Sequence, residues 1–119
     1  MEFPKSKQLL DLFNEAIKTI SRMGNQYQPM LAPLFVRALN NLESPVYRRD
    51  HQVLMLSVAH RCVDQAEKKV VAKIIGDEWV AGEEYSRLIR IRTICFISKG
   101  ILNQNLQDAK KPLNSRVLD

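Results

Sequence analysis

The stretch that decides the fold is EEYSRLIRIRTICFISKGIL, residues 83–102, because its apolar residues point in almost every direction. A helix advances about 100° per residue, which divides these residues between two opposite sides. One side carries Tyr85, Ile89, Thr93, Phe96 and Ile97, and the other carries Leu88, Ile91, Cys95 and Leu102. A helix that is apolar all round is normally buried. The stretch therefore predicts either the central helix of a small bundle or a helix lying between two subunits.

Apolar residues spaced three and four apart predict further helices upstream of this stretch. The expected ranges are residues 4–23, 31–42 and 44–75. Pro33 should fall in the first turn of its helix, where proline is tolerated. Ser44 followed by Pro45 is typical of a helix start, with the serine as N-cap. Gly24 and Gly76 supply stop signals after the first and third of these helices.

Several apolar residues in the last two segments are β-branched and would also suit a strand. Residues 88–92 alternate briefly between apolar and polar side chains, but the alternation fails from Thr93 onward. Residues 76–82 are also too many for a two-residue hairpin turn. Helix is therefore our interpretation of both segments.

The chain ends in a segment without helical periodicity, residues 106–119, which contains Pro112. Such a segment is typical of a mobile tail. Of the 119 residues, 45% are hydrophobic and 26% are charged, which is enough for one core. We therefore expect a single helical domain, residues 1–105, followed by a short mobile C-terminal tail, residues 106–119. The predicted fold class is all-α, a small bundle of about four helices that is dimeric in solution.

We expect neither a targeting segment nor a membrane span. The first residues, MEFPKSK, mix both charges and lack the apolar block of a secretory signal. Four basic residues between positions 87 and 99 interrupt the best candidate for a membrane span. Cys62 and Cys95 are expected to be free core thiols in a reducing compartment. The sequence thus predicts a cytoplasmic protein, or a nuclear one if its source is eukaryotic or viral, with no membrane partner.

Residue types suited to catalysis occur together at Ser57, His60 and Asp64, which would form one line along a helix. A working nucleophile needs an oxyanion hole, and its base usually comes from a different element, so this line is expected to be a solvated face. His51 and His60 are nine residues apart and point to opposite faces, which excludes a shared metal ion. We therefore predict no enzyme activity, no metal site and no cofactor.

The charge of the chain is its main functional signal. Eighteen Lys and Arg against thirteen Asp and Glu give a net charge of +5, which favours anionic partners. The basic residues that we predict to contact nucleic acid follow the third and fourth helices: Arg48, Arg49, Arg61, Lys68, Lys69, Lys73, Arg87, Arg90, Arg92 and Lys99. Such rows can follow a phosphate backbone. An equally strong alternative is that long basic side chains merely keep the surface of a packed bundle solvated.

The acidic residues argue against a helix-turn-helix mode of binding. They occupy positions 77, 78, 83 and 84, around the start of the last predicted helix, where a groove-reading helix would meet phosphates and base edges. Contact between basic helix flanks and the phosphate backbone, without base reading, fits the charges better. A-form duplexes are read mainly in this way.

Three short fragments, MGNQYQ at 23–28, VRALNNL at 36–42 and EKKVVA at 67–72, resemble the silencing suppressors of insect nodaviruses. Members of that family are helical dimers that cover double-stranded RNA, so the resemblance implies a helical dimer on an RNA duplex. The fragments cover less than a fifth of the chain, and Ser44 and Pro45 fall where that family keeps one uninterrupted helix. No RNA contact is therefore carried over to individual residues, and the chain is not assigned to the family.

The sequence predicts a non-catalytic, homodimeric helical protein that binds the phosphate backbone of nucleic acid, with double-stranded RNA as the candidate duplex. The alternative is a protein-interaction module, such as an adaptor, an inhibitor or an assembly subunit. Its partner protein would meet the apolar fourth helix or the loop around Trp79. The residues predicted for that protein interface are Trp79, Tyr85, Leu88, Ile91, Cys95 and Leu102.

Overall fold

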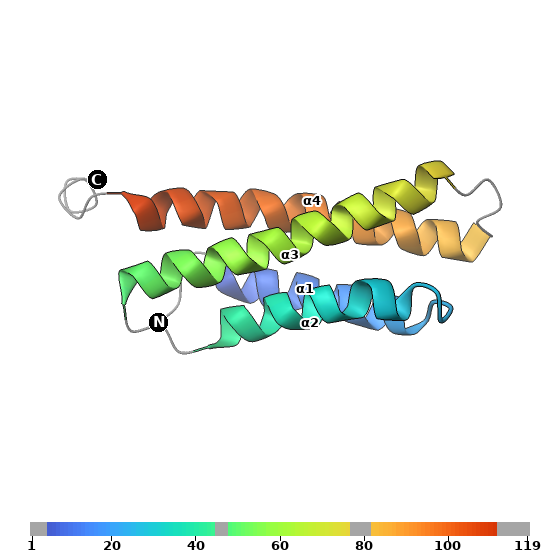
Figure 1. The fold of residues 1–119 in the computed structure, drawn as a ribbon, viewed down its shortest axis with the longest axis horizontal. Helices are drawn as coiled ribbons and strands as arrows, with labels where there is room; N and C mark the ends of the chain where they lie inside the picture. Colours follow the sequence, from blue (N-terminus) through green and yellow to red (C-terminus); the bar gives the residue numbers. More distant parts are fainter. Residues whose placement is uncertain (1–4, 45–47, 77–81, 112–119) are drawn as a thin grey trace.

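Four consecutive helices, each antiparallel to the next, make up most of the molecule (Figure 1). The computed structural model describes residues 5–44, 48–76 and 82–111. The helices are α1 (Ser6–Ser21), α2 (Gln28–Glu43), α3 (Arg49–Gly76) and α4 (Gly82–Lys110). No strand occurs in the described ranges. The predicted all-α bundle of four helices is therefore confirmed.

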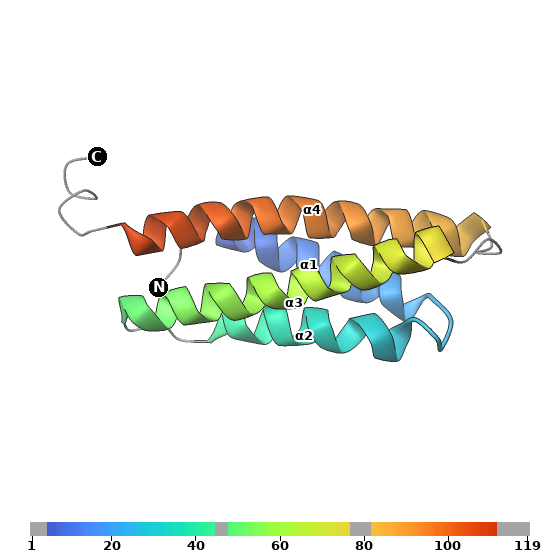
Figure 2. The same ribbon diagram turned by 45° about the horizontal axis from the view of Figure 1, so that its top comes forward.

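Each helix packs mainly against two neighbours, so the bundle resembles a square in cross-section, with α1, α2, α3 and α4 at successive corners. Figure 2 shows α3 running between α4 and α2, with α1 behind them. The molecule consequently has four faces, each made by two adjacent helices. The α2/α3 face and the α1/α4 face lie on opposite sides of the bundle.

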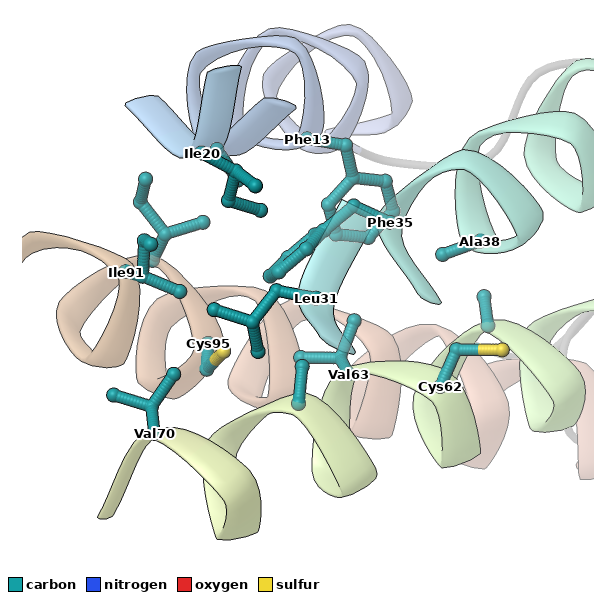
Figure 3. Packing of buried hydrophobic residues seen from close by; sticks show 14 of the residues in the cluster. Phe13, Ile20, Leu31, Phe35, Ala38, Cys62, Val63, Val70, Ile91 and Cys95 are labelled. Carbon is teal, nitrogen blue, oxygen red and sulfur yellow. The ribbon is translucent and has the colours of Figure 1, made fainter. Parts of the chain in front are cut away.

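The core is built from the apolar stripes of all four helices (Figure 3). Phe13 of α1 and Phe35 of α2 are fully buried, and their ring centroids lie 6.1 Å apart with an interplanar angle of 59°. This tilted arrangement is favourable for aromatic pairs. Ile91 and Cys95 of α4 point into the same core. The three- and four-residue spacing of such positions is the helical period that the sequence displays.

Helix α4 buries only one of its two apolar sides. The side that faces the other helices carries five residues that are 0% exposed: Leu88, Ile91, Cys95, Ser98 and Leu102. On the opposite side, Phe96 is 76% exposed and Tyr85 is 47% exposed. The sequence predicts that the whole helix is buried, but a single chain buries only its inner side. Helices α1 and α3 flank α4 and do not cover its outer side. Among the described helices, none combines the length and the apolar character that a bilayer span requires.

The junction between α1 and α2 is tighter than the sequence predicts. Helix α2 begins at Gln28 rather than near residue 31, so Pro33 lies beyond the first turn. The Gln28 side chain also links the start of α2 to the end of α1. Its Nε2 donates to the carbonyl of Met23 at 2.7 Å and to that of Ser21 at 3.2 Å, which satisfies carbonyl groups at the end of α1.

The predicted role of Ser44 as the N-cap of the third helix is wrong. Ser44 instead ends α2, with an extended backbone (φ −66°, ψ 141°), and its Oγ donates to the carbonyl of Asn40 at 2.8 Å. Helix α3 begins only at Arg49, and Pro45 lies outside the described residues. A serine near a helix end is ambiguous, because its hydroxyl can serve either a preceding carbonyl or a following N–H.

Helix α4 runs further than predicted. It continues to Lys110, five residues beyond residue 105. Ala109 is 2% exposed, and Nε of Arg49 donates to its carbonyl. This contact satisfies one of the carbonyl groups that a helix end leaves without a partner and places a cation at the negative end of the helix dipole. Residues 112–119 of the predicted tail lie outside the described part of the chain.

Phe35→Ala should destabilise the bundle by about 3–5 kcal/mol, because truncation of a buried phenylalanine removes apolar burial and leaves a cavity. The adjacent substitution Val36→Ala is the control. Val36 is 42% exposed, and surface substitutions usually change stability by less than about 0.5 kcal/mol. Urea denaturation followed by circular dichroism measures both variants. Equal free energies of unfolding would contradict the position of Phe35 in the core.

Candidate functional site

The ten predicted nucleic-acid contacts fall into three groups in the folded chain. Five form ion pairs within the chain: Arg48, Lys68, Arg87, Arg90 and Lys99. Arg49 donates to the carbonyl of Ala109 at the end of α4. The remaining four make no ion pair with any described residue: Arg61, Lys69, Lys73 and Arg92. Free positive charge therefore belongs to a minority of the predicted residues.

Lys99 is the most constrained of the paired cations. Its Nζ lies 2.7 Å from Oδ1 of Asp64 and 2.9 Å from Oε1 of Glu67, so one ammonium group joins α4 to α3. Lys68 lies 3.2 Å from the second oxygen of Asp64. Hydrogen bonds from Lys99 and Lys68 lower the pKa of Asp64, and the bonds to both carboxylates raise the pKa of Lys99. Lys99 is therefore a structural cation that is already neutralised.

Arg87 and Arg90 are also neutralised inside the chain. Arg90 pairs with Glu15 of α1, across the α1/α4 face. Arg87 lies 3.6 Å from both Glu83 and Glu84, one turn back on α4. Both arginines line a polar cavity of about 320 Å³ between α1 and α4, together with Glu15, Lys18 and Arg22.

Lys69 and Lys73 lie on the side of α3 that faces α2. Arg61 lies about 80° and 120° round the helix from them, toward the outward flank of α3. Lys69 and Lys73 line a cavity of about 360 Å³ to which α2 also contributes. Burial raises the pKa of the Cys62 thiol, and the charges of Arg37 of α2 and Arg61 of α3 act against this effect. We call this set the basic face: Arg37, Arg61, Lys69 and Lys73.

The carboxylates of α2 and α3 are placed away from the basic face. Asp64 and Glu67 turn toward α4, where they hold Lys99. Asp50 pairs with Arg48 at the start of α3. The acidic residue of α2 is Glu43, at the C-terminal end of that helix. The four cations of the basic face therefore keep their positive charge.

The length of the basic face matches a phosphate backbone. From Arg61 to Lys73 the chain advances twelve residues, roughly 18 Å along the helix. Phosphate charges recur about every 1.7 Å along the axis of a duplex, so a row of this length spans several of them. Arg37 was missed in the sequence, because its effect on Cys62 of α3 depends on how α2 packs against α3. The one usable signal was that α2 carries no acidic residue before its last position.

The predicted protein-interface residues divide between the core and the surface. Four of them lie in the core, where a partner of the folded chain cannot reach them: Leu88, Ile91, Cys95 and Leu102. Tyr85 is exposed, and Trp79 lies outside the described residues. Arg92 is separate from the basic face, since it lines a cavity of about 360 Å³ together with Thr93 and Phe96. The outer side of α4 is thus a second surface, distinct from the basic face.

The residues of catalytic types do not come together as a nucleophile, a base and an orienting acid. The carboxylate of Asp64 is held by Lys99, and burial together with the charge of Lys99 lowers the pKa of His60. Both cysteines are free, as predicted. Burial raises the pKa of Cys95 to about 12 and also raises that of Cys62, which makes them weak nucleophiles. No group of three possible metal ligands occurs among the described residues.

A scan against protein-family models finds no match for this chain, and searches of curated proteins and of solved structures find none either. Function is therefore inferred from the geometry of this chain's own residues.

Lys99→Met should destabilise the bundle most near neutral pH. Because the folded-state pKa of Asp64 lies below its ordinary 3.8, its contribution is present above pH 3.8 and is lost as the pH falls through the folded-state value. Because the pKa of Lys99 lies above its ordinary 10.5, its contribution is present below pH 10.5 and is lost as the pH rises through the folded-state value.

Urea unfolding of wild type and Lys99→Met over a pH series measures this effect. The difference in unfolding free energy should shrink toward both extremes of pH. Lys69→Met is the control, because Lys69 is exposed and makes no ion pair with a described residue. The difference in unfolding free energy between this variant and wild type should not change with pH. A Lys99→Met difference that does not change with pH would contradict the structural role of this ion pair.

Proposed function

We propose that this protein binds the phosphate backbone of nucleic acid without reading base sequence, and that the basic face is its contact surface. The observation that supports the proposal is that Lys69 and Lys73 line one cavity at the α2/α3 face, while Asp64 and Glu67 of α3 are held by Lys99 of α4. A surface of one charge attracts phosphates over a distance, and each contact releases a condensed counterion.

A duplex fits this surface better than a single strand. Single-strand binding relies on aromatic side chains that stack on bases. Among the described residues, the exposed aromatic side chains are Tyr85 and Phe96, both on α4 and away from the basic face. Cations carried along roughly 18 Å of α3 can contact the regular backbone of a duplex, and A-form RNA is recognised mainly through shape and backbone. Double-stranded RNA is therefore the first ligand to test.

Replacing Arg61, Lys69 and Lys73 together by Gln should weaken binding to duplex RNA and flatten its salt dependence. If each cation neutralises one phosphate, the slope of log K against log salt should fall by about 0.9 for every cation that is removed. Fluorescence anisotropy of a labelled duplex at several salt concentrations measures the affinity and the slope. Circular dichroism checks that the variant remains helical.

The matched control removes the same charge elsewhere. Lys7→Gln, Lys18→Gln and Lys110→Gln together change exposed residues outside the basic face. This control should keep most of the affinity, because only the long-range charge has changed. An equal reduction of affinity in both variants would show that net charge, rather than the basic face, attracts the duplex. A wild-type protein that fails to bind any duplex at low salt would overturn the proposed function.

The second candidate function is protein interaction, and the outer side of α4 favours it. Phe96, Tyr85 and Ile97 are 76%, 47% and 39% exposed, although they are large apolar residues. Exposed apolar residues that lie close together are typical of contact sites. This surface does not overlap the basic face, so one chain can carry both functions. Protein interaction becomes the first candidate if wild-type protein does not bind duplexes.

A further inference from the structure

The outer side of α4 carries an alternating pattern of large and small residues. Ile89, Thr93, Phe96 and Gly100 follow one another at steps of four, three and four residues, so they share one side of the helix. Phe96 is 76% exposed, and a Cβ added to Gly100 would meet open space. This side of α4 is therefore a ridge in which protruding side chains alternate with notches.

Grooves flank this ridge on both sides. The groove between α3 and α4 has a volume of about 360 Å³ and is lined in part by Val71 and Phe96. The groove between α1 and α4 has a volume of about 390 Å³ and is lined in part by Leu12 and Ile97. Ridges and grooves of this kind allow a further helix to pack against α4.

We propose that two copies of this chain form a two-fold symmetric dimer in which their α4 helices pack antiparallel, outer side against outer side. In this antiparallel pair the two-fold axis passes midway between Thr93 and Phe96. Ile89 then lies opposite Gly100 of the second copy, and Phe96 lies opposite its Thr93. Every large residue then meets a small one. A parallel arrangement in register would instead set Phe96 against Phe96 and Gly100 against Gly100. The surface is thus complementary to itself, as a two-fold interface requires.

The charges on this surface agree with the same arrangement. Arg92 lies beside the ridge and makes no ion pair with a described residue of its own chain. Glu67 lines the same groove. In the antiparallel register, Arg92 lies level with position 97 of the second copy, beside the segment where Glu67 of that copy meets Lys99. Each copy therefore offers a cation to the carboxylate of the other.

The length of α4 suits a stable interface. Its 29 residues extend roughly 43 Å, and stable interfaces bury about 800 Å² on each partner. A ridge with a groove on either side offers a contact wider than one helix. The dimer also places the apolar residues that a single chain leaves exposed, Phe96 above all, in a buried position.

The dimer also has a consequence for nucleic-acid binding, and this consequence alone rests on the proposed function. A two-fold axis that relates antiparallel α4 helices keeps the two α3 helices on the same side of the dimer. The basic residues carried by both α3 helices then lie on that side of the dimer. A parallel dimer would place them on opposite sides.

Light scattering across a micromolar concentration series tests whether the dimer forms. Wild-type protein should have twice the mass of one chain. Phe96→Glu should be monomeric and still helical, because Phe96 is exposed within one chain and a charge there opposes burial between two copies. Val36→Glu is the control, since it places the same charge on an exposed residue of α2 and should remain dimeric. A monomeric wild type at high micromolar concentration would overturn the proposal.

Disulfide trapping tests the antiparallel orientation. A mixture of Ile89→Cys and Gly100→Cys chains should cross-link readily, because these positions face each other. Ile89→Cys alone should not, since its two copies lie eleven residues apart, roughly 16 Å, and a disulfide requires Cα atoms within about 7 Å. The native Cys62 and Cys95 are 4% and 0% exposed. Rapid cross-linking of Ile89→Cys with itself would overturn the antiparallel arrangement.

The two proposals fail separately. A dimer that binds no duplex removes the proposed function and leaves the antiparallel dimer standing. A monomer that binds duplex RNA does the reverse.

Discussion

One ammonium group decides how charge is distributed over this bundle. Lys99 of α4 holds Asp64 and Glu67 of α3 and so joins the two longest helices. Because both carboxylates turn toward α4, the flank of α3 that faces α2 has no acidic side chain to neutralise it. The basic face is therefore a by-product of a structural contact. Any change that released Asp64 from Lys99 would alter the packing of α4 and the charge of α3 together.

The four helices and the inner side of α4 could be predicted from the spacing of apolar residues. A helix that buries one stripe in a bundle has apolar residues three and four positions apart, whichever helices it packs against. Ion pairs one turn apart on a helix, such as Lys68 with Asp64, also follow from spacing. Pairs between helices, such as Arg90 with Glu15, depend on which helices are neighbours. The sequence could therefore place the basic residues on helices but could not show which of them keep their charge.

Helix ends were the least predictable part of the fold, for two physical reasons. The hydroxyl of Ser44 can satisfy either a preceding carbonyl or a following N–H, and it serves the carbonyl of Asn40. The end of α4 is held by Arg49, whose position in space depends on the packing of α3. The proposed function is harder still to recognise in a sequence, because a nonspecific phosphate contact needs only cations at suitable distances and no fixed order of residues.

The buried thiol of Cys95 is a natural probe of how the bundle opens. Cys95 is 0% exposed, and burial raises its pKa to about 12, so a thiol reagent reaches it only while α4 is detached from its neighbours. The rate of its modification therefore measures how often the bundle opens along α4. If α4 is enclosed between its own core and a second copy of the chain, that opening becomes rarer as the protein becomes more concentrated.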